Sequence, residues 1–238
     1  MGYGGYPKYV SVAEKRVKAA IALAKLKKKN PNIQPVIIEG RSLAKNWWGK
    51  AWNNNLESYA DYSNRISRGR SYVKNNAVLD LNIVKGSVIA QVKGSRVKPY
   101  EVVVKLDALS QEKWSQVTEL CNHSIVSLEQ LVEGKFPERL EILFTDHKYG
   151  FFPSPEEIHF GCNCPDWAYM CKHVAAVLYG IGSRLDHDPM LFFEIRDVDS
   201  HALIKKTMES KLDSMLDNAN KKSNREIEEK DIFNIFGV

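Results

Sequence analysis

Long apolar runs are absent from this 238-residue sequence, and none approaches the ~18 residues that a membrane-spanning helix needs. The N-terminal segment also has no apolar core of the kind that a secretion signal requires. We therefore expect a cytoplasmic protein that makes no membrane contact and whose thiols stay reduced. Cysteine is scarce, with four residues. In a reducing compartment, so small a set indicates metal binding or chemistry before disulfides.

Motifs for catalysis are missing as well. The sequence has no phosphate-binding G-x-x-x-x-G-K-[ST], no G-x-S-x-G and no His-Glu-x-x-His. Cys121 and His123 could in principle form a nucleophilic pair, but a spacing of two residues at a helix end argues against it. Asp166 has no second carboxylate placed by the sequence to work with it. We therefore expect a binding protein, not an enzyme, with no small-molecule substrate.

Acidic residues are rare in the first third of the chain. Residues 1–75 hold 15 Lys and Arg against 4 Asp and Glu, which leaves 19 against 25 in the remainder. A basic segment joined to an acidic one is common in proteins that meet phosphate backbones. It is equally compatible with two halves that attract each other, or with an ordinary solvated surface.

Residues 1–108 are expected to form a basic α+β region that begins with a helix. Ser11 and Glu14 make a capping box, and the Ala-, Leu- and Lys-rich segment behind them predicts a helix over 11–29. An edge strand, a second helix and a polar loop are then expected at 35–38, 45–59 and 61–76.

A three-stranded antiparallel meander completes this region. Apolar residues alternate in three short runs, and Lys85-Gly86 between the first two is a tight-turn signal. The predicted strands cover 77–84, 87–93 and 99–106.

Residues 109–217 are expected to form a helical region, followed by a loose polar tail over 218–238. Ser110 can cap the first of its helices, and Gly134 can end the second. The LEILF segment within 138–146 favours a strand. Helices are predicted over 111–121, from 124 or 127 to 133, over 188–195 and over 199–217.

Three cysteines and one histidine lie within twelve residues, as Cys162, Cys164, Cys171 and His173. Three thiolates and an imidazole suit a tetrahedral Zn²⁺ ion. Because four protein ligands leave no position open to water, the set predicts one structural zinc ion and not a catalytic one.

The spacing of these residues predicts their local structure. In an extended segment, residues two apart point to the same side, so Cys162 and Cys164 can reach one ion. On a helix, residues two apart lie ~200° apart, so Cys171 is expected in the turn before a helix and His173 in its first turn. Trp167, in the loop between the two pairs, is expected to pack over the site as a lid.

Other assignments of the cysteines fit this sequence less well than zinc does. A disulfide between Cys162 and Cys164 would be a strained small ring in a reducing compartment. Iron–sulfur ligation uses thiolates too, but the close cysteine pair and the histidine make it a minor alternative. Each thiol alone could be buried and inert, which is the state expected of Cys121.

The string C-x-C-x₆-C-x-H resembles the SWIM zinc finger, whose pattern is C-x-C, a variable gap and C-x-H. Other stretches, among them PVIIEGRSLAKNWWGKAWNNNLE and GIGSRLDHDPMLFF, are similar to prokaryotic SWIM-finger proteins often encoded beside SNF2-type helicases. The similarity covers most of residues 7–196. It implies a ββα finger over about 159–182 that holds zinc through the same four residues, and a DNA- or protein-binding role.

Basic and aromatic side chains flank the predicted meander and are candidates for contacting nucleic acid. Arginine binds phosphates with two donors, and tyrosine can stack on a base; ordinary loop charges are the alternative. The candidates are Arg65, Arg68, Arg70, Tyr72 and Lys74 before the meander, and Arg96 and Lys98 between its last strands. Trp47, Trp48 and Trp52 are spaced along a helix and are expected to anchor the core instead of stacking bases.

Taken together, the sequence predicts a zinc-binding accessory protein of nucleic-acid transactions. Its basic first third would contact DNA or RNA, and its helical half would bind an SNF2-type helicase. Part of the apolar run 190–193 is expected to be core, and the rest is the expected docking patch for this partner, with Arg184 among the exposed residues nearby. The alternative is a protein–protein interaction adaptor that does not touch nucleic acid.

Overall fold

The computed structural model describes residues 10–58, 63–116, 144–146 and 150–199, and isolated positions between 205 and 217. Its helices are α1 (Val12–Lys29), α2 (Trp47–Glu57), α3 (Ser63–Lys74), α7 (Lys172–His187) and α8 (Leu191–Ile195), with a 3₁₀ turn η2 (Pro155–Glu157). Its strands are β1 (Val78–Val84), β2 (Ser87–Val92), β3 (Tyr100–Leu106) and β4 (Ile158–Cys162). No helix in these ranges combines the length and the apolar character that crossing a membrane requires.

The strands form one antiparallel sheet in the order β1-β2-β3-β4. The predicted meander is confirmed as β1–β3, but the strand count of three is wrong because β4 pairs along β3. In this pairing Val102 lies opposite Cys162, and Leu106 lies opposite Ile158. Strands from both sides of residue 108 therefore share one sheet. Alternation within each strand could not reveal this pairing, because the two strands are far apart in the sequence.

The edge of β1 that does not face β2 is covered by the segment that follows α1. The amide of Val36 donates to the carbonyl oxygen of Val78 (3.1 Å), and the amide of Leu81 donates to that of Gln34 (2.9 Å). These two bonds do not make a strand of 35–38, so that prediction is wrong, although the segment does cover the edge where it was expected.

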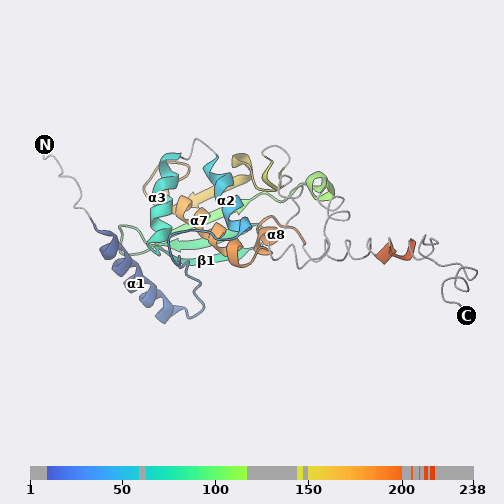
Figure 1. Cartoon of the computed structure of the whole chain (residues 1–238). Helices are drawn as coiled ribbons and strands as arrows, with labels where there is room; N and C mark the ends of the chain where they lie inside the picture. Colours follow the sequence, from blue (N-terminus) through green and yellow to red (C-terminus); the bar gives the residue numbers. More distant parts are fainter. Residues whose placement is uncertain are drawn as a thin grey trace, which may run out of the picture.

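Helix α7 lies at the centre of the fold. It contacts all four strands on one side, and α2 and α3 pack against its other side. Figure 1 shows α7 against the sheet, with α2 and α3 beside it. Along β2 and β3, buried residues alternate with more exposed ones, as expected for a sheet with one covered face.

Glycines allow the outer helices to approach α7 closely. A Cβ atom on Gly69 of α3 would lie 2.4 Å from Cβ of Ala175 and 2.7 Å from its carbonyl carbon. On Gly49 of α2, it would lie 2.6 Å from the carbonyl oxygen of Gly182. Because these distances are shorter than real carbon contacts, the packing requires glycine at both positions.

Helix α3 replaces the loop that the sequence predicted over 61–76. Residues 63–74 are helical, so the prediction is wrong for this range. Ser, Asn and Gly have weak helix propensity, and the local sequence therefore does not favour a helix. Packing along α7 provides the stabilisation instead, as it does for most helices in proteins.

Replacing Gly69 by alanine is expected to lower the free energy of unfolding by about 1–3 kcal/mol, the usual cost of overpacking. The direction is informative, because alanine in a helix interior is otherwise favoured over glycine by about 1 kcal/mol. Gly161→Ala is the matched control, since a Cβ there would lie 3.9 Å from Val103. Urea denaturation measures both variants. A Gly69→Ala protein as stable as the unmodified one would contradict the packing.

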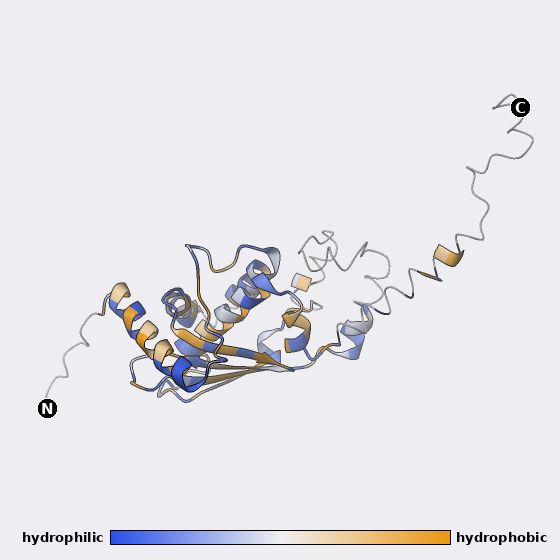
Figure 2. Ribbon diagram, turned by 90° about the horizontal axis from the view of Figure 1, so that it is seen from below, coloured by the Kyte–Doolittle hydropathy of each residue, from blue (hydrophilic) through white to orange (hydrophobic). Residues whose placement is uncertain are grey.

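Helix α1 confirms the predicted helix over 11–29. The side chain of Ser11 accepts a hydrogen bond from the amide of Glu14 (3.2 Å). Within α1, Ala19 is the buried residue, so most of the helix surface faces solvent. Figure 2 shows α1 beside one end of the sheet.

An aromatic cluster fills the opposite end of the sheet. Trp48 and Trp52 are completely buried, and Nε1 of Trp52 donates to the carbonyl oxygen of Leu178 (2.9 Å). Trp47 packs edge-on against Trp48, with ring centroids 5.2 Å apart. The prediction that these tryptophans anchor the core, within a helix near 45–59, is confirmed by α2.

The apolar run at 190–193 belongs to the same cluster. Phe192 and Phe193 are buried, with ring centroids 5.6 Å and 6.2 Å from that of Trp48. Arg184 is half-buried and donates to the carbonyl oxygens of Gln34 and Pro35. Part of this run is therefore core, as expected, while Arg184 is less exposed than expected. The use of the partly buried Met190 and Leu191 for docking stays a prediction.

The remaining predicted elements are described in part. Residues 111–116 are helical, and the hydroxyl of Ser110 accepts from the amide of Lys113 (3.2 Å), which confirms the predicted cap. The predicted helix over 188–195 appears as the shorter α8. Outside the described residues lie 117–121, the helix ending at 133, most of 138–146, much of 199–217 and the tail from 218.

Candidate metal centre

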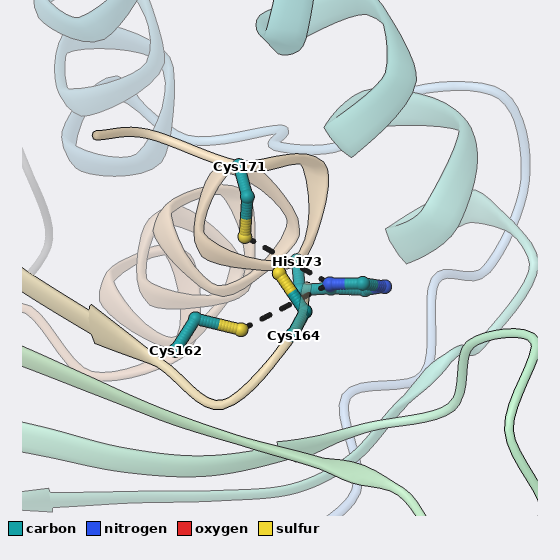
Figure 3. A group of neighbouring side chains, drawn as sticks. All are labelled: Cys162, Cys164, Cys171 and His173. Carbon is teal, nitrogen blue, oxygen red and sulfur yellow. Dashed lines mark hydrogen bonds between the residues drawn. The ribbon is translucent and has the colours of Figure 1, made fainter. Parts of the chain in front are cut away.

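The four predicted ligands come together where β4 ends and α7 begins. Cys162 is the last residue of β4, Cys164 follows two residues later, Cys171 is the N-cap of α7, and His173 lies in its first turn. Their ligand atoms all lie within 4.8 Å of one another. Figure 3 shows the three sulfur atoms and the imidazole facing a common centre. The predicted positions of Cys171 and His173 are confirmed.

The spacing of the donor atoms matches a tetrahedral ion. Nδ1 of His173 lies 3.9 Å from Sγ of Cys162 and 3.8 Å from Sγ of Cys171. Ligands bound to zinc at ~2.0–2.3 Å lie roughly 3.6–3.8 Å from each other across a tetrahedron. The centre can therefore hold a metal ion with four protein ligands after only small movements.

The environment of the thiols favours a thiolate at Cys171. A hydrogen bond from the thiol of Cys162 lowers the pKa of Cys171 to about 3, and the same hydrogen bond raises the pKa of Cys162. Cys171 also lies at the positive end of the α7 helix dipole, which stabilises a thiolate. Because metals bind the thiolate form, Cys171 is the sulfur donor best prepared for a cation.

His173 is held rigidly in a pocket of rings. Its imidazole stacks on Tyr100 with centroids 4.2 Å apart, and Tyr72 packs edge-on at 5.3 Å. The side chain is 1% exposed, and Nε2 has no hydrogen-bond partner in the described part of the chain. Gly94 completes the pocket, because a Cβ there would lie 2.8 Å from Nε2. The ring is thus fixed with Nδ1 toward the three sulfur atoms, which fits a metal ligand.

Two of the candidate nucleic-acid residues, Arg65 and Arg96, bond to the chain around the metal centre. Arg65 contacts the loop between Cys164 and Cys171, and Arg96 contacts Asn163 just before that loop. Nη2 of Arg65 forms an ion pair with Oδ1 of Asp166 at 3.2 Å. Arg96 donates to Oδ1 of Asn163 (3.0 Å), and its guanidinium lies 4.0 Å from the ring centroid of Tyr100. The structure therefore uses both arginines to support the metal centre.

Two further candidates have partners on neighbouring helices. Arg70 forms an ion pair with Glu57 and contacts the hydroxyl group of Tyr179, and its pKa is raised by the hydrogen bond to Glu57. Tyr72 packs on His173, and burial raises the pKa of its hydroxyl group. Both lie on α3 and not in the predicted loop, which explains why their side chains meet the core.

The other three candidates differ in their exposure to solvent. Arg68 on α3 and Lys98 between β2 and β3 are exposed. Lys74 is half-buried at the end of α3, and its carbonyl oxygen accepts from Nη2 of Arg16 (3.2 Å). Of the seven candidates, Arg68 and Lys98 are thus the ones best placed to meet a large ligand without rearrangement.

The sequence did not indicate the walls of the site. Tyr100 begins β3, and Gly94 lies in the loop before it, so nothing local connects either residue with His173. The prediction that Trp167 packs as a lid is wrong, because its side chain is 94% exposed. The residue next to it, Asp166, does bind inward, through Arg65.

Antiparallel topology explains why these residues meet. β1 and β3 begin, and β2 and β4 end, at the same end of the sheet. The loop over 93–99, the end of α3 and the start of α7 therefore lie beside the metal centre. We call this part of the molecule the basic end, defined by α1, Arg68 and the loop over 93–99.

Comparisons with known proteins give one informative relative. No family model matches the chain, and no solved structure matches it. It is 31% identical over 164 residues to the uncharacterized protein Rv2102 of Mycobacterium tuberculosis, a match that covers 68% of this chain and 59% of that protein. The chain thus matches about three fifths of the length of this relative. The name of the relative states no activity, so the SWIM resemblance stays a prediction.

Proposed function

We propose that this chain is a zinc-stabilised accessory protein that binds nucleic acid through its basic end. The observation that carries the proposal is the gathering of basic residues beside a closed Cys₃His centre. The centre would act as a structural support, since its four donors leave no position for a substrate. Binding, and not catalysis, is the function we propose.

Zinc is the metal that the donor set favours. Three thiolates with one imidazole are typical of structural zinc sites. Soft thiolate ligands disfavour magnesium, calcium and manganese, which prefer oxygen. The ion would join β4 to the start of α7, and it would thereby hold the loops that carry Arg96 and Asp166 in place.

The basic end brings together cations that are distant in the sequence. Helix α1 contributes seven basic residues against one acidic residue, Glu14. Burial and the nearby charge of Lys18 lower the pKa of Lys93, which places α1 close to the loop over 93–99. Arg16 also bonds to the end of α3. Such a concentration of positive charge is typical of surfaces that bind phosphate backbones.

The partner of this protein is part of the proposal. An SNF2-type helicase is proposed from the sequence resemblance, and within the run at 190–193 the partly buried Met190 and Leu191 are the residues that remain for its docking surface. A protein–protein adaptor without nucleic-acid contact is the competing function. The exposed side chains Val97, Trp167 and Tyr169 would suit either kind of partner, so the charged residues provide the sharper test.

Replacing Lys15, Arg68 and Lys98 together by alanine is expected to weaken nucleic-acid binding of every sequence. All three are exposed, so the fold should persist. A plot of log K against log salt has a negative slope, and each lost phosphate contact makes it less steep by about 0.7–0.9. The slope of the triple variant should therefore flatten by roughly two to three units. Fluorescence anisotropy over a salt series measures both effects.

A matched control changes the net charge equally at other places. Lys50, Lys85 and Lys105 are exposed and lie outside the basic end. Their triple alanine variant should keep the affinity and the salt slope. Equal losses of nucleic-acid affinity in the two triple variants would show a nonspecific charge effect. If the unmodified protein binds no nucleic acid, the adaptor function is favoured.

A further inference from the structure

Trp167 is the most exposed tryptophan or tyrosine of the described chain, at 94%. Leaving a large indole in water gives up the favourable burial that such side chains usually obtain. Single exposed apolar residues are normal on protein surfaces, so exposure alone shows little. The informative observations are how firmly the loop is held and which charges surround it.

The loop that carries Trp167 is held at both ends and in the middle. Cys164 and Cys171 place its ends at the metal centre. Oδ1 of Asp166 accepts from the amide of Ala168 (3.3 Å) as well as from Arg65. The hydroxyl group of Tyr169 donates to the carbonyl oxygen of Ile158 (3.1 Å). Fixed neighbours on both sides hold the backbone that presents the indole outward.

Positive charge flanks this loop on two sides. On one side, Arg65 neutralises Asp166, and the exposed Arg68 lies one helical turn further along α3. On the other side, Arg96 bonds to Asn163 of the same segment, and Lys98 lies two residues beyond it. A polyanion can therefore reach cations on either side of the indole.

We infer that Trp167 is a base-stacking residue for single-stranded nucleic acid, an inference that rests on the proposed function. Phosphates of the strand bind Arg68 and Lys98, and one unpaired base stacks on the indole, as in other single-strand binding surfaces. The faces of bases inside a duplex are covered by their neighbours, so this contact selects unpaired strands. The surrounding cations favour a polyanion over an apolar protein surface as the ligand.

The test uses the full-length, zinc-loaded chain and two probes, an oligothymidine of about 15 nucleotides and a mixed-sequence duplex of about 15 base pairs, sizes that suit such surfaces. Trp167→Ala should weaken oligothymidine binding about 5- to 150-fold, the range that loss of one stacked base implies. Its affinity for the duplex should not change. Trp167→Phe keeps an aromatic face and should restore much of the single-strand affinity.

Intrinsic fluorescence gives a second readout. Trp48 and Trp52 are completely buried and Trp47 and Trp114 are partly buried, so quenching by oligothymidine should come mainly from Trp167 and should be strongly reduced in Trp167→Ala. Zinc content and melting temperature should stay unchanged in this variant, because the side chain is exposed.

The possible failures are distinguishable. If Trp167→Ala binds both probes as tightly as the unmodified protein does, the stacking role is overturned and the proposed function stands. Equal weakening for both probes would overturn the selection of single strands. Binding of neither probe by the unmodified protein would overturn the proposed function together with this inference.

Discussion

Replacing Cys171 by serine is expected to abolish stoichiometric zinc binding and to unfold at least the region from 160 to 182. Cys171 is 1% exposed and forms the N-cap of α7, the helix that contacts all four strands. A serine hydroxyl group cannot replace the thiolate. Structural zinc contributes about 10–16 kcal/mol of binding free energy in small fingers, and even part of this value is comparable to the ~5–15 kcal/mol that stabilises a whole domain.

Elemental analysis and thermal melting measure the two consequences. The unmodified chain should carry one zinc ion, and Cys171→Ser should carry none and melt at a much lower temperature. Cys121→Ser is the matched control, since the sequence assigns that thiol no ligand role, and it should keep its zinc. Full zinc content in Cys171→Ser, or loss of zinc in Cys121→Ser, would show that a ligand has been assigned wrongly.

Replacing Glu157 by glutamine is expected to lower the free energy of unfolding by about 3–5 kcal/mol, the cost of leaving a buried charge without its partner. Nη2 of Arg196 lies 2.6 Å from Oε1 of Glu157, and the arginine side chain is completely buried. In the described part of the chain, Nε and Nη1 of Arg196 have no hydrogen-bond partner. The carboxylate is therefore the main compensation for this charge.

A second pair with the opposite exposure gives the control. The carboxylate of Asp107 lies 2.9 Å from Nε2 of His159, and both side chains are more than half exposed. Asp107→Asn makes the same chemical change and should alter stability by less than about 1 kcal/mol. Similar losses in the two variants would contradict the special role of Glu157.

The difference in free energy of unfolding between the unmodified chain and Glu157→Gln should also depend on pH. Burial alone would raise the pKa of Glu157, but hydrogen bonds from Arg196 and from the amide of Ser154 outweigh it, and the pKa is lowered. The carboxylate therefore stabilises the folded state fully above its unfolded pKa of about 4.3, and this contribution is lost as the pH falls through the lower folded pKa. Denaturation at several pH values should show the unmodified chain and Glu157→Gln converging in acid.

Local patterns predicted the local parts of the structure well. Ser11 marked the start of α1, the alternation of apolar residues located β1–β3, and a spacing of two residues placed Cys171 before a helix and His173 inside it. Each of these results depends on neighbours in the sequence, where hydrogen bonding and side-chain direction decide the conformation.

The errors arose where distant segments decide the outcome. Helix α3 forms because Gly69 allows close contact with Ala175, and no residue near it in the sequence announces that contact. β4 completes the sheet by pairing with a strand that precedes it by many residues. The basic residues before the meander illustrate the same point, because Arg65 and Arg70 have partners, Asp166 and Glu57, that periodicity cannot reveal.

The location of the metal ligands bears on how the sheet is protected from other chains. β4 is a five-residue strand and covers the edge of β3, and its last residue, Cys162, is a candidate metal ligand. An ion that links Cys162 to α7 holds this strand against the sheet. Without it, the short strand can fray and leave unpaired amide and carbonyl groups along β3, an edge to which a strand of another molecule can add. The availability of metal in the cell would then set the risk of aggregation as well as the stability of the fold.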